Sequence, residues 1–113
     1  MSDIKLNKES EYVLTAMYKE FLDRYNQGVP RDKSKIFGHQ DNISKLVQEI
    51  PQQDIYGLLF ELSHLEMITV SPGANIFIFV SISTKGIIYM ENKFGKDVVK
   101  TVNWLLKAKS LFV

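Results

Sequence analysis

The chain has 113 residues, 45% of them hydrophobic, and a formal net charge of +1. That length suits one compact domain over residues 1–113, and so small a net charge gives no global basic signal for nucleic acid or anionic membranes. The chain has no cysteine, which excludes disulfides, cysteine-based zinc sites and thiol chemistry.

No segment is typical of a targeting or membrane-spanning sequence. The first eight residues are polar and charged, unlike a signal peptide. The longest apolar run, Ile76 to Val80, is far too short to span a bilayer. We therefore expect a cytoplasmic protein without a membrane partner.

Positive charge is unevenly distributed along the chain. No lysine or arginine occurs from Leu46 to Thr84, where the acidic residues are Glu49, Asp54, Glu61 and Glu66. Residues 85–113 hold six basic and two acidic residues. The excess positive charge therefore lies near the C-terminal end of the sequence.

Apolar residues at three- and four-residue spacing predict a first helix. Asn7 or Ser10 can cap its start, and it should run to about Asn26. Gly28 and Pro30 end it. Its predicted core face comprises Val13, Leu14, Met17, Phe21 and Tyr25.

A loop, a short strand and two more helices are predicted next. Residues 29–35 are polar and basic, which is typical of a loop, and 36–38 can form a very short strand. A second helix begins at about residue 41 or 42 and runs to 50, and a third spans about 51–67. Pro51 cannot continue one helix but can start another, so this tight break is typical of a helix-turn-helix.

A hairpin and two final helices complete the chain. Strands are predicted at 68–70 and 76–82, joined by turn-forming residues. Thr84 can cap a further helix, Gly95 interrupts it, and a last helix is predicted from about Lys96 toward Lys109.

The second strand of the hairpin is apolar on both faces. One face is expected to meet the core and carries Ile76, Ile78, Val80 and Ile82. Phe77 and Phe79 lie on the other face, where a solvated sheet would show polar residues. Either a helix of the same chain or a second copy should cover them.

The order helix, helix, turn, helix, hairpin, helix resembles winged helix-turn-helix proteins over nearly the whole chain. The most specific local match is the leucine-rich third helix ending at Met67-Ile68, followed after the hairpin by Ser83-Thr84-Lys85-Gly86. With its extra C-terminal helix, the chain is similar to the small YjcQ-type winged-helix proteins of Gram-positive bacteria and their phages. The resemblance implies an α+β, mostly helical winged helix-turn-helix with a β-hairpin wing, and DNA binding or transcription regulation.

DNA binding by this fold would place the third helix in the major groove. Gln52 or Gln53 could read adenine there, but the acidic residues of the helix would face phosphates. Two basic clusters lie elsewhere and are candidate phosphate contacts: Arg31, Lys33 and Lys35 in the loop, and Lys96, Lys100 and Lys107 on the last helix. Solvated faces are the alternative interpretation of both clusters.

Surplus apolar residues predict contacts beyond the core. Tyr56 and Phe60 lie one turn apart on the third helix, and pack either under the last helix or on a partner. The last helix has a predicted core stripe of Val98, Val99, Val102, Leu105 and Leu106. Its opposite side carries Trp104, Ala108 and Leu111, followed by Phe112, which predicts a homodimer through this helix. The alternative is that Trp104 packs wholly within its own chain.

Two functions follow from these observations. The first is DNA binding by a winged helix, with double-stranded DNA as the partner and weak contacts made mostly to the DNA backbone. The alternative is a protein–protein interaction module on the same scaffold that does not bind DNA.

No residue spacing is typical of an enzyme. His39 and His64 are the only histidines, and nothing resembles a zinc site, a phosphate loop or a nucleophile elbow. His39 near Asp41 fits either a loop histidine or a contact at the start of a helix. We expect no catalysis, cofactor, metal or small-molecule substrate.

Overall fold

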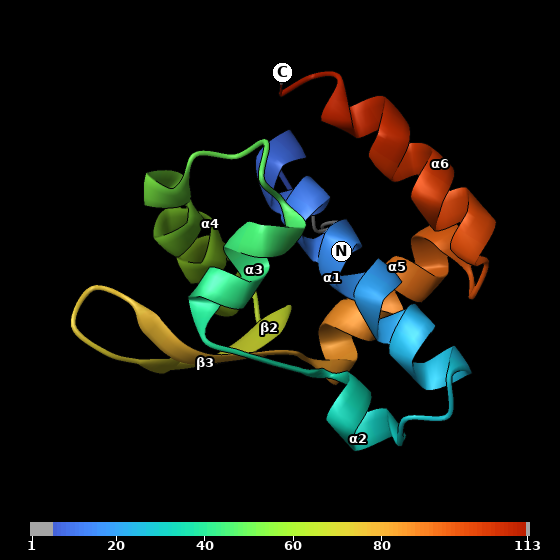
Figure 1. Ribbon diagram of the computed structural model, residues 1–113, viewed down its shortest axis with the longest axis horizontal. Helices are drawn as coiled ribbons and strands as arrows, with labels where there is room; N and C mark the ends of the chain where they lie inside the picture. The colour runs from blue at the N-terminus through green and yellow to red at the C-terminus, as the bar shows by residue number, and fades with distance from the viewer. Residues whose placement is uncertain (1–5, 113) are drawn as a thin grey trace, which may run out of the picture.

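The computed structural model describes residues 6–112 and shows an α+β fold made mostly of helices. The helices are α1 (Lys8–Asn26), α2 (Arg31–Ser34), α3 (Gln40–Leu46), α4 (Gln52–His64), α5 (Thr84–Phe94) and α6 (Val98–Lys109). The strands are β1 (Ile36–Gly38), β2 (Ile68–Pro72) and β3 (Phe77–Ile82). In Figure 1, α1 lies between α4 and α6, and the β2–β3 hairpin projects beyond the helices.

The strands form one antiparallel sheet in the order β1-β3-β2. Along the hairpin, Val70 lies opposite Val80 and Ile68 lies opposite Ile82. The register shifts between Ser71 and Pro72, close to the turn. The short strand predicted at 36–38 is confirmed and pairs with β3.

That shift in register changes which residues of β3 face the core. Phe77 is buried, whereas Ile78 is 55% exposed. The predicted inward face is therefore right for Val80 and Ile82 but wrong for Ile78. Strict alternation fails because a bulge adds a residue to one strand, so side chains beyond it exchange faces.

Side-chain caps set where the helices begin. The Asn7 side chain accepts a hydrogen bond from the Ser10 N–H at 2.8 Å, which confirms Asn7 as the start of α1. Ser83, one residue before the predicted Thr84, caps α5. Asp97 caps α6, so this helix begins at Val98 rather than near Lys96.

Residues 29–35 were predicted to be an irregular loop. In the structure, Arg31–Ser34 form one helical turn within this segment. Pro30 precedes that turn with a φ of −54°, which already suits helix entry. The Ser34 hydroxyl then donates to the carbonyls of Val29 and Pro30. These local bonds stabilise the turn although no apolar periodicity marks it in the sequence.

Two helices are confirmed on either side of Pro51, but the first ends at Leu46 rather than at residue 50, so residues 47–51 separate them where a tighter break was predicted. His39 Nδ1 accepts from the Asp41 N–H at 3.1 Å, so α3 begins one residue later, at Gln40. This confirms the predicted role of His39 at a helix start. Helix α4 ends at His64, and Glu66 follows in a left-handed conformation with φ 64°.

The core is centred on α1, which contacts α2, α3, α4, α5 and α6. Val13, Leu14, Met17 and Phe21 are buried as predicted, whereas Tyr25 is 46% exposed. At the base of the hairpin, Gly86 of α5 lies directly against the Met67 carbonyl. A close approach of this kind requires glycine.

The face of α6 that meets the core differs from the predicted stripe. Val99 and Leu106 are 67% and 63% exposed, while Thr101 and Ala108 are buried. Small side chains at these two positions let α6 lie close to α1, and the larger apolar residues then remain at the edges or outside. Periodicity alone cannot show this, because the two faces of α6 are similarly apolar.

Candidate interaction surfaces

The outer surface of α4 is acidic and apolar rather than basic. Its exposed residues include Gln52 and Gln53 at the start of the helix, followed by Asp54, Gly57, Phe60, Glu61 and His64. The nearest cations in sequence lie outside the stretch 46–84. Phosphates approaching this surface would therefore meet carboxylates.

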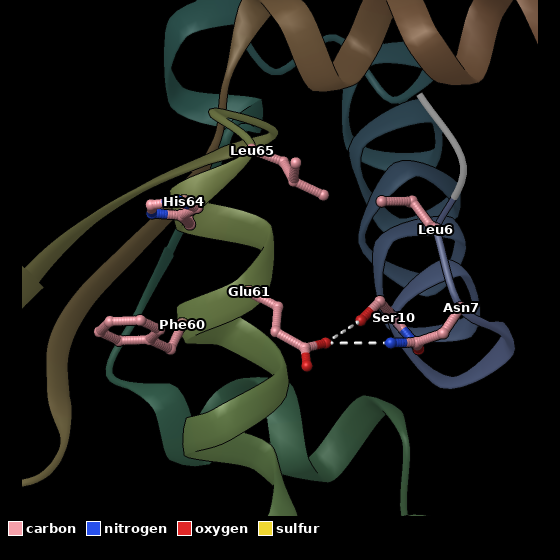
Figure 2. Close-up of a pocket in the computed structure, with 7 residues that line it drawn as sticks. All are labelled: Leu6, Asn7, Ser10, Phe60, Glu61, His64 and Leu65. Atoms are coloured by element: carbon pink, nitrogen blue, oxygen red, sulfur yellow. Dashed lines mark hydrogen bonds between the residues drawn. The ribbon is translucent and has the colours of Figure 1, made fainter. Parts of the chain in front are cut away.

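Glu61 connects this surface to the start of α1. One oxygen of its carboxylate accepts from Asn7 Nδ2 and from Ser10 Oγ, each at 3.0 Å (Figure 2). Ser10 is only 2% exposed, so its hydroxyl is committed to this contact. Sequence analysis missed the link because the partners lie more than fifty residues apart.

A groove of about 370 Å³ lies beside this contact, between α4 and the segment that leads into α1. It is lined by Leu6, Asn7, Ser10, Phe60, Glu61, His64 and Leu65. Figure 2 shows Leu6 and Leu65 pointing toward one another across the groove, with Phe60 and His64 on the far side of α4. Phe60 is 55% exposed, an unusual position for so large an apolar side chain.

Tyr56 behaves differently from Phe60. Its ring stacks on Phe77 of β3 with the ring centroids 4.7 Å apart. A helix of the same chain therefore covers Phe77, which is one of the two predicted alternatives. Tyr56 packs on the hairpin and not under the last helix.

Five cations of the described chain form salt bridges with carboxylates: Lys19, Arg24, Lys85, Lys93 and Lys109. Neither predicted basic cluster takes part in one among residues 6–112. Arg31, Lys33, Lys96, Lys100 and Lys107 are exposed, and Lys35 Nζ lies 3.4 Å from Thr84 Oγ1. No carboxylate in residues 6–112 therefore lies within salt-bridge distance of these cations.

The turn that precedes Lys96 is held against the middle of α1. The Tyr18 hydroxyl donates to the Gly95 carbonyl at 2.7 Å, which places the start of the α5–α6 turn against α1. Burial and the negative charge of Glu91 raise the pKa of Tyr18 to about 12, and the positive charge of Arg31 opposes that shift. The Arg31 guanidinium itself lies over the Phe21 ring of α1, 5.6 Å from the ring centroid.

The predicted interface residues of the last helix lie partly within their own chain. Trp104 packs edge-on against Phe94, with ring centroids 5.9 Å apart, and the Lys93 ammonium lies over its indole. Phe112 packs on Tyr12 at 4.9 Å, whereas Leu111 is 61% exposed. The homodimer through this helix stays a prediction.

Comparison with known proteins identifies no relative, since no family model, curated protein or solved structure matches the chain. Among residues 6–112, no helix combines the length and apolar character needed to cross a membrane. The same residues contain no group of three histidine or carboxylate side chains placed to hold a metal ion.

Proposed function

We propose that this protein is a winged helix-turn-helix that binds duplex DNA mainly through its backbone. The arrangement of α3, α4 and the β2–β3 hairpin supports the fold assignment, with the hairpin as the wing and α6 as an added helix. Such a role fits the expected cytoplasmic location.

The observation that carries this proposal is that the cations of the two basic clusters form no salt bridge within residues 6–112. Cations already paired with carboxylates gain little from phosphate, because they must first give up a partner. Lys96, Lys100 and Lys107 have no such partner among residues 6–112, and neither has Arg31. Gln52 and Gln53 are the proposed base contacts at the exposed start of α4.

Fluorescence anisotropy with labelled duplex DNA tests the proposal. Binding should be measurable at about 50 mM salt and should fall steeply as salt increases, because bound phosphates release counterions. Replacing Lys96, Lys100 and Lys107 with Gln should make the slope of log affinity against log salt shallower by about 3.

The matched control removes the same charge elsewhere, by replacing Lys8, Lys19 and Lys45 with Gln, and should keep the slope. An equal loss of slope in both triple variants would show that binding follows net charge rather than the α6 row. No binding by the wild type at about 50 mM salt would contradict DNA binding altogether.

A second function, protein–protein interaction through α4, is favoured by a different observation. The exposed Phe60 borders an apolar groove to which α4 contributes no lysine or arginine, which suits a protein partner better than DNA. Affinity purification from the native host should recover a specific protein with the wild type and lose it with Phe60→Ser. Ile88→Ser is the matched control, since Ile88 is 50% exposed on α5, away from this surface. Equal recovery by all three proteins would contradict this function.

A further inference from the structure

We propose that the partner of the α4 surface is a second copy of this chain, bound head-to-tail through its α6 surface. The α4 surface comprises Gln53, Asp54, Gly57, Phe60 and Glu61, and the α6 surface comprises Val99, Lys100, Asn103, Leu106 and Lys107. The inference rests on the second proposed function, for which it names the partner, and does not require DNA binding.

The α6 surface combines apolar and positive side chains. Val99 and Leu106 lie two turns apart on one line of the helix and are each more than 60% exposed. Lys100 and Lys107 follow them directly, so each exposed apolar residue has a lysine beside it. Exposure of this apolar row to water is unfavourable, whereas a partner with apolar and negative groups would cover it favourably.

The α4 surface has the opposite character. Around Gly57 lies a shallow hollow of about 400 Å³ whose lining includes Glu9, Asp54 and Glu61. Phe60 follows Gly57 by one turn and provides the apolar part of the surface. The hollow can accept a lysine with its stem over Gly57 and its ammonium among the three carboxylates.

Gly57 has no role that the single chain explains. Glycine inside a helix costs up to about 1 kcal/mol relative to alanine. No neighbouring atom lies within 4 Å of the position that a Cβ would take, so no close packing within the chain requires glycine. Close approach by another molecule does require a flat surface at this position.

The two surfaces cannot neutralise each other within one chain. Helix α1 contacts both α4 and α6 and lies between them in Figure 1. A chain therefore presents an acidic apolar surface on one side and a basic apolar surface on the other. Contacts between unlike surfaces are heterologous, and they produce rings or open chains of subunits rather than a closed two-fold dimer.

Two double variants, each with one charged residue and one apolar residue replaced by uncharged polar residues, test this arrangement by analytical ultracentrifugation. Asp54→Asn with Phe60→Ser removes the α4 surface, and Lys100→Gln with Leu106→Ser removes the α6 surface. The wild type should form species larger than a dimer as its concentration rises, and should dissociate in high salt as the Debye length falls to about 3 Å at 1 M. Each double variant alone should remain a monomer.

An equimolar mixture of the two variants gives the decisive result. One intact α4 surface and one intact α6 surface remain, so the mixture should form a one-to-one heterodimer and nothing larger. A homodimer formed by the variant with an intact α6 would instead show two-fold pairing through α6 and overturn the proposal. A wild type that stays monomeric at all concentrations in low salt would also overturn it.

Gly57→Ala provides an independent test that does not depend on removing surface charge. The variant should be more stable than the wild type in urea yet associate at least tenfold more weakly. Unchanged association would contradict the proposal that a lysine of the second copy lies over Gly57. Capture of a different host protein that is lost with Phe60→Ser, without any self-association, would refute this inference while leaving the second proposed function intact.

Discussion

Glu49 joins three separate parts of the chain through one carboxylate. The Tyr12 hydroxyl of α1 donates to one of its oxygens at 2.6 Å, and the Lys109 ammonium of α6 lies 3.2 Å from the other. The Tyr12 hydrogen bond and the Lys109 charge lower the pKa of Glu49, although partial burial opposes them. Burial and the adjacent Glu49 carboxylate raise the pKa of Tyr12 far above its usual range.

This contact predicts a stability difference that depends on pH. The pKa of Glu49 is lower in the folded chain than its usual 4.5. The ionised Glu49 carboxylate therefore contributes fully to the free energy of unfolding above pH 4.5, and this contribution is lost as pH falls through the pKa of the folded chain. Glu49→Gln should lower the free energy of unfolding by about 1 to 2 kcal/mol near neutral pH. The gap should narrow progressively as pH falls below 4.5 in urea titrations, and a gap that stays constant over that range would contradict the ionic contribution of Glu49.

Two glycines of the helices predict opposite results for the same substitution. Gly86→Ala would drive a Cβ into the Met67 backbone carbonyl, so it should destabilise the fold by about 1 to 3 kcal/mol or more. Gly57→Ala adds a methyl group in open space, so it should stabilise the fold by up to about 1 kcal/mol. Urea unfolding of both variants measures the contrast, and a loss of stability in Gly57→Ala would contradict it.

At the scale of elements, α6 is held by small buried side chains and by contacts at its ends. Thr101 and Ala108 are the α6 residues that are buried, and Phe112 and Lys109 secure its C-terminal end on α1 and Glu49. Close approach of two helices leaves no room for a larger side chain at such positions. The position of α6 therefore depends on residues that carry little hydrophobic surface themselves.

Ala108→Leu tests this dependence. Overpacking should cost about 1 to 3 kcal/mol and move α6 away from α1. Trp104 is the only tryptophan and contacts Phe94, so its emission should shift to longer wavelength as α6 moves. Ile88→Ala is the control, because a side chain that is 50% exposed and lies outside both proposed surfaces should change stability by less than about 0.5 kcal/mol. If the emission and the stability of Ala108→Leu were unchanged, α6 and α1 would not be closely packed at this position.

The order of the elements could be predicted from local signals, because their physical causes are local. Asn7 and Pro51 mark helix starts by their own side chains, and Gly95 ends α5 with a φ of 65°. The predicted inward orientation of Ile78 was wrong, because a bulge in β3 depends on how this strand pairs with another strand.

The surfaces were harder to predict because their charges are neutralised by distant partners. Lys93 forms a salt bridge with Glu11 and Lys109 with Glu49, so neither adds to the basic surface that their sequence neighbours form. The buried face of α6 likewise depends on how α1 approaches it. Nonlocal packing of this kind leaves no periodic signal in a single sequence.

On the scale of the whole molecule, charge is separated across α1. The acidic apolar α4 surface lies on one side and the lysines of α6 lie on the other, with little net charge overall. Such a distribution gives the molecule a dipole that orients it toward any charged partner at low salt. Both proposed functions use this separation, through opposite ends.

The missing cations between Leu46 and Thr84 also have a consequence for proteolysis. Trypsin cleaves after lysine and arginine, so it has no cleavage point between Lys45 and Lys85. Helix α4 and the whole β2–β3 hairpin would therefore leave any complete digest as one peptide, folded or not. Tryptic protection can report the opening of α6 or α2, but movements of the β2–β3 hairpin need a protease that cleaves at acidic or aromatic residues.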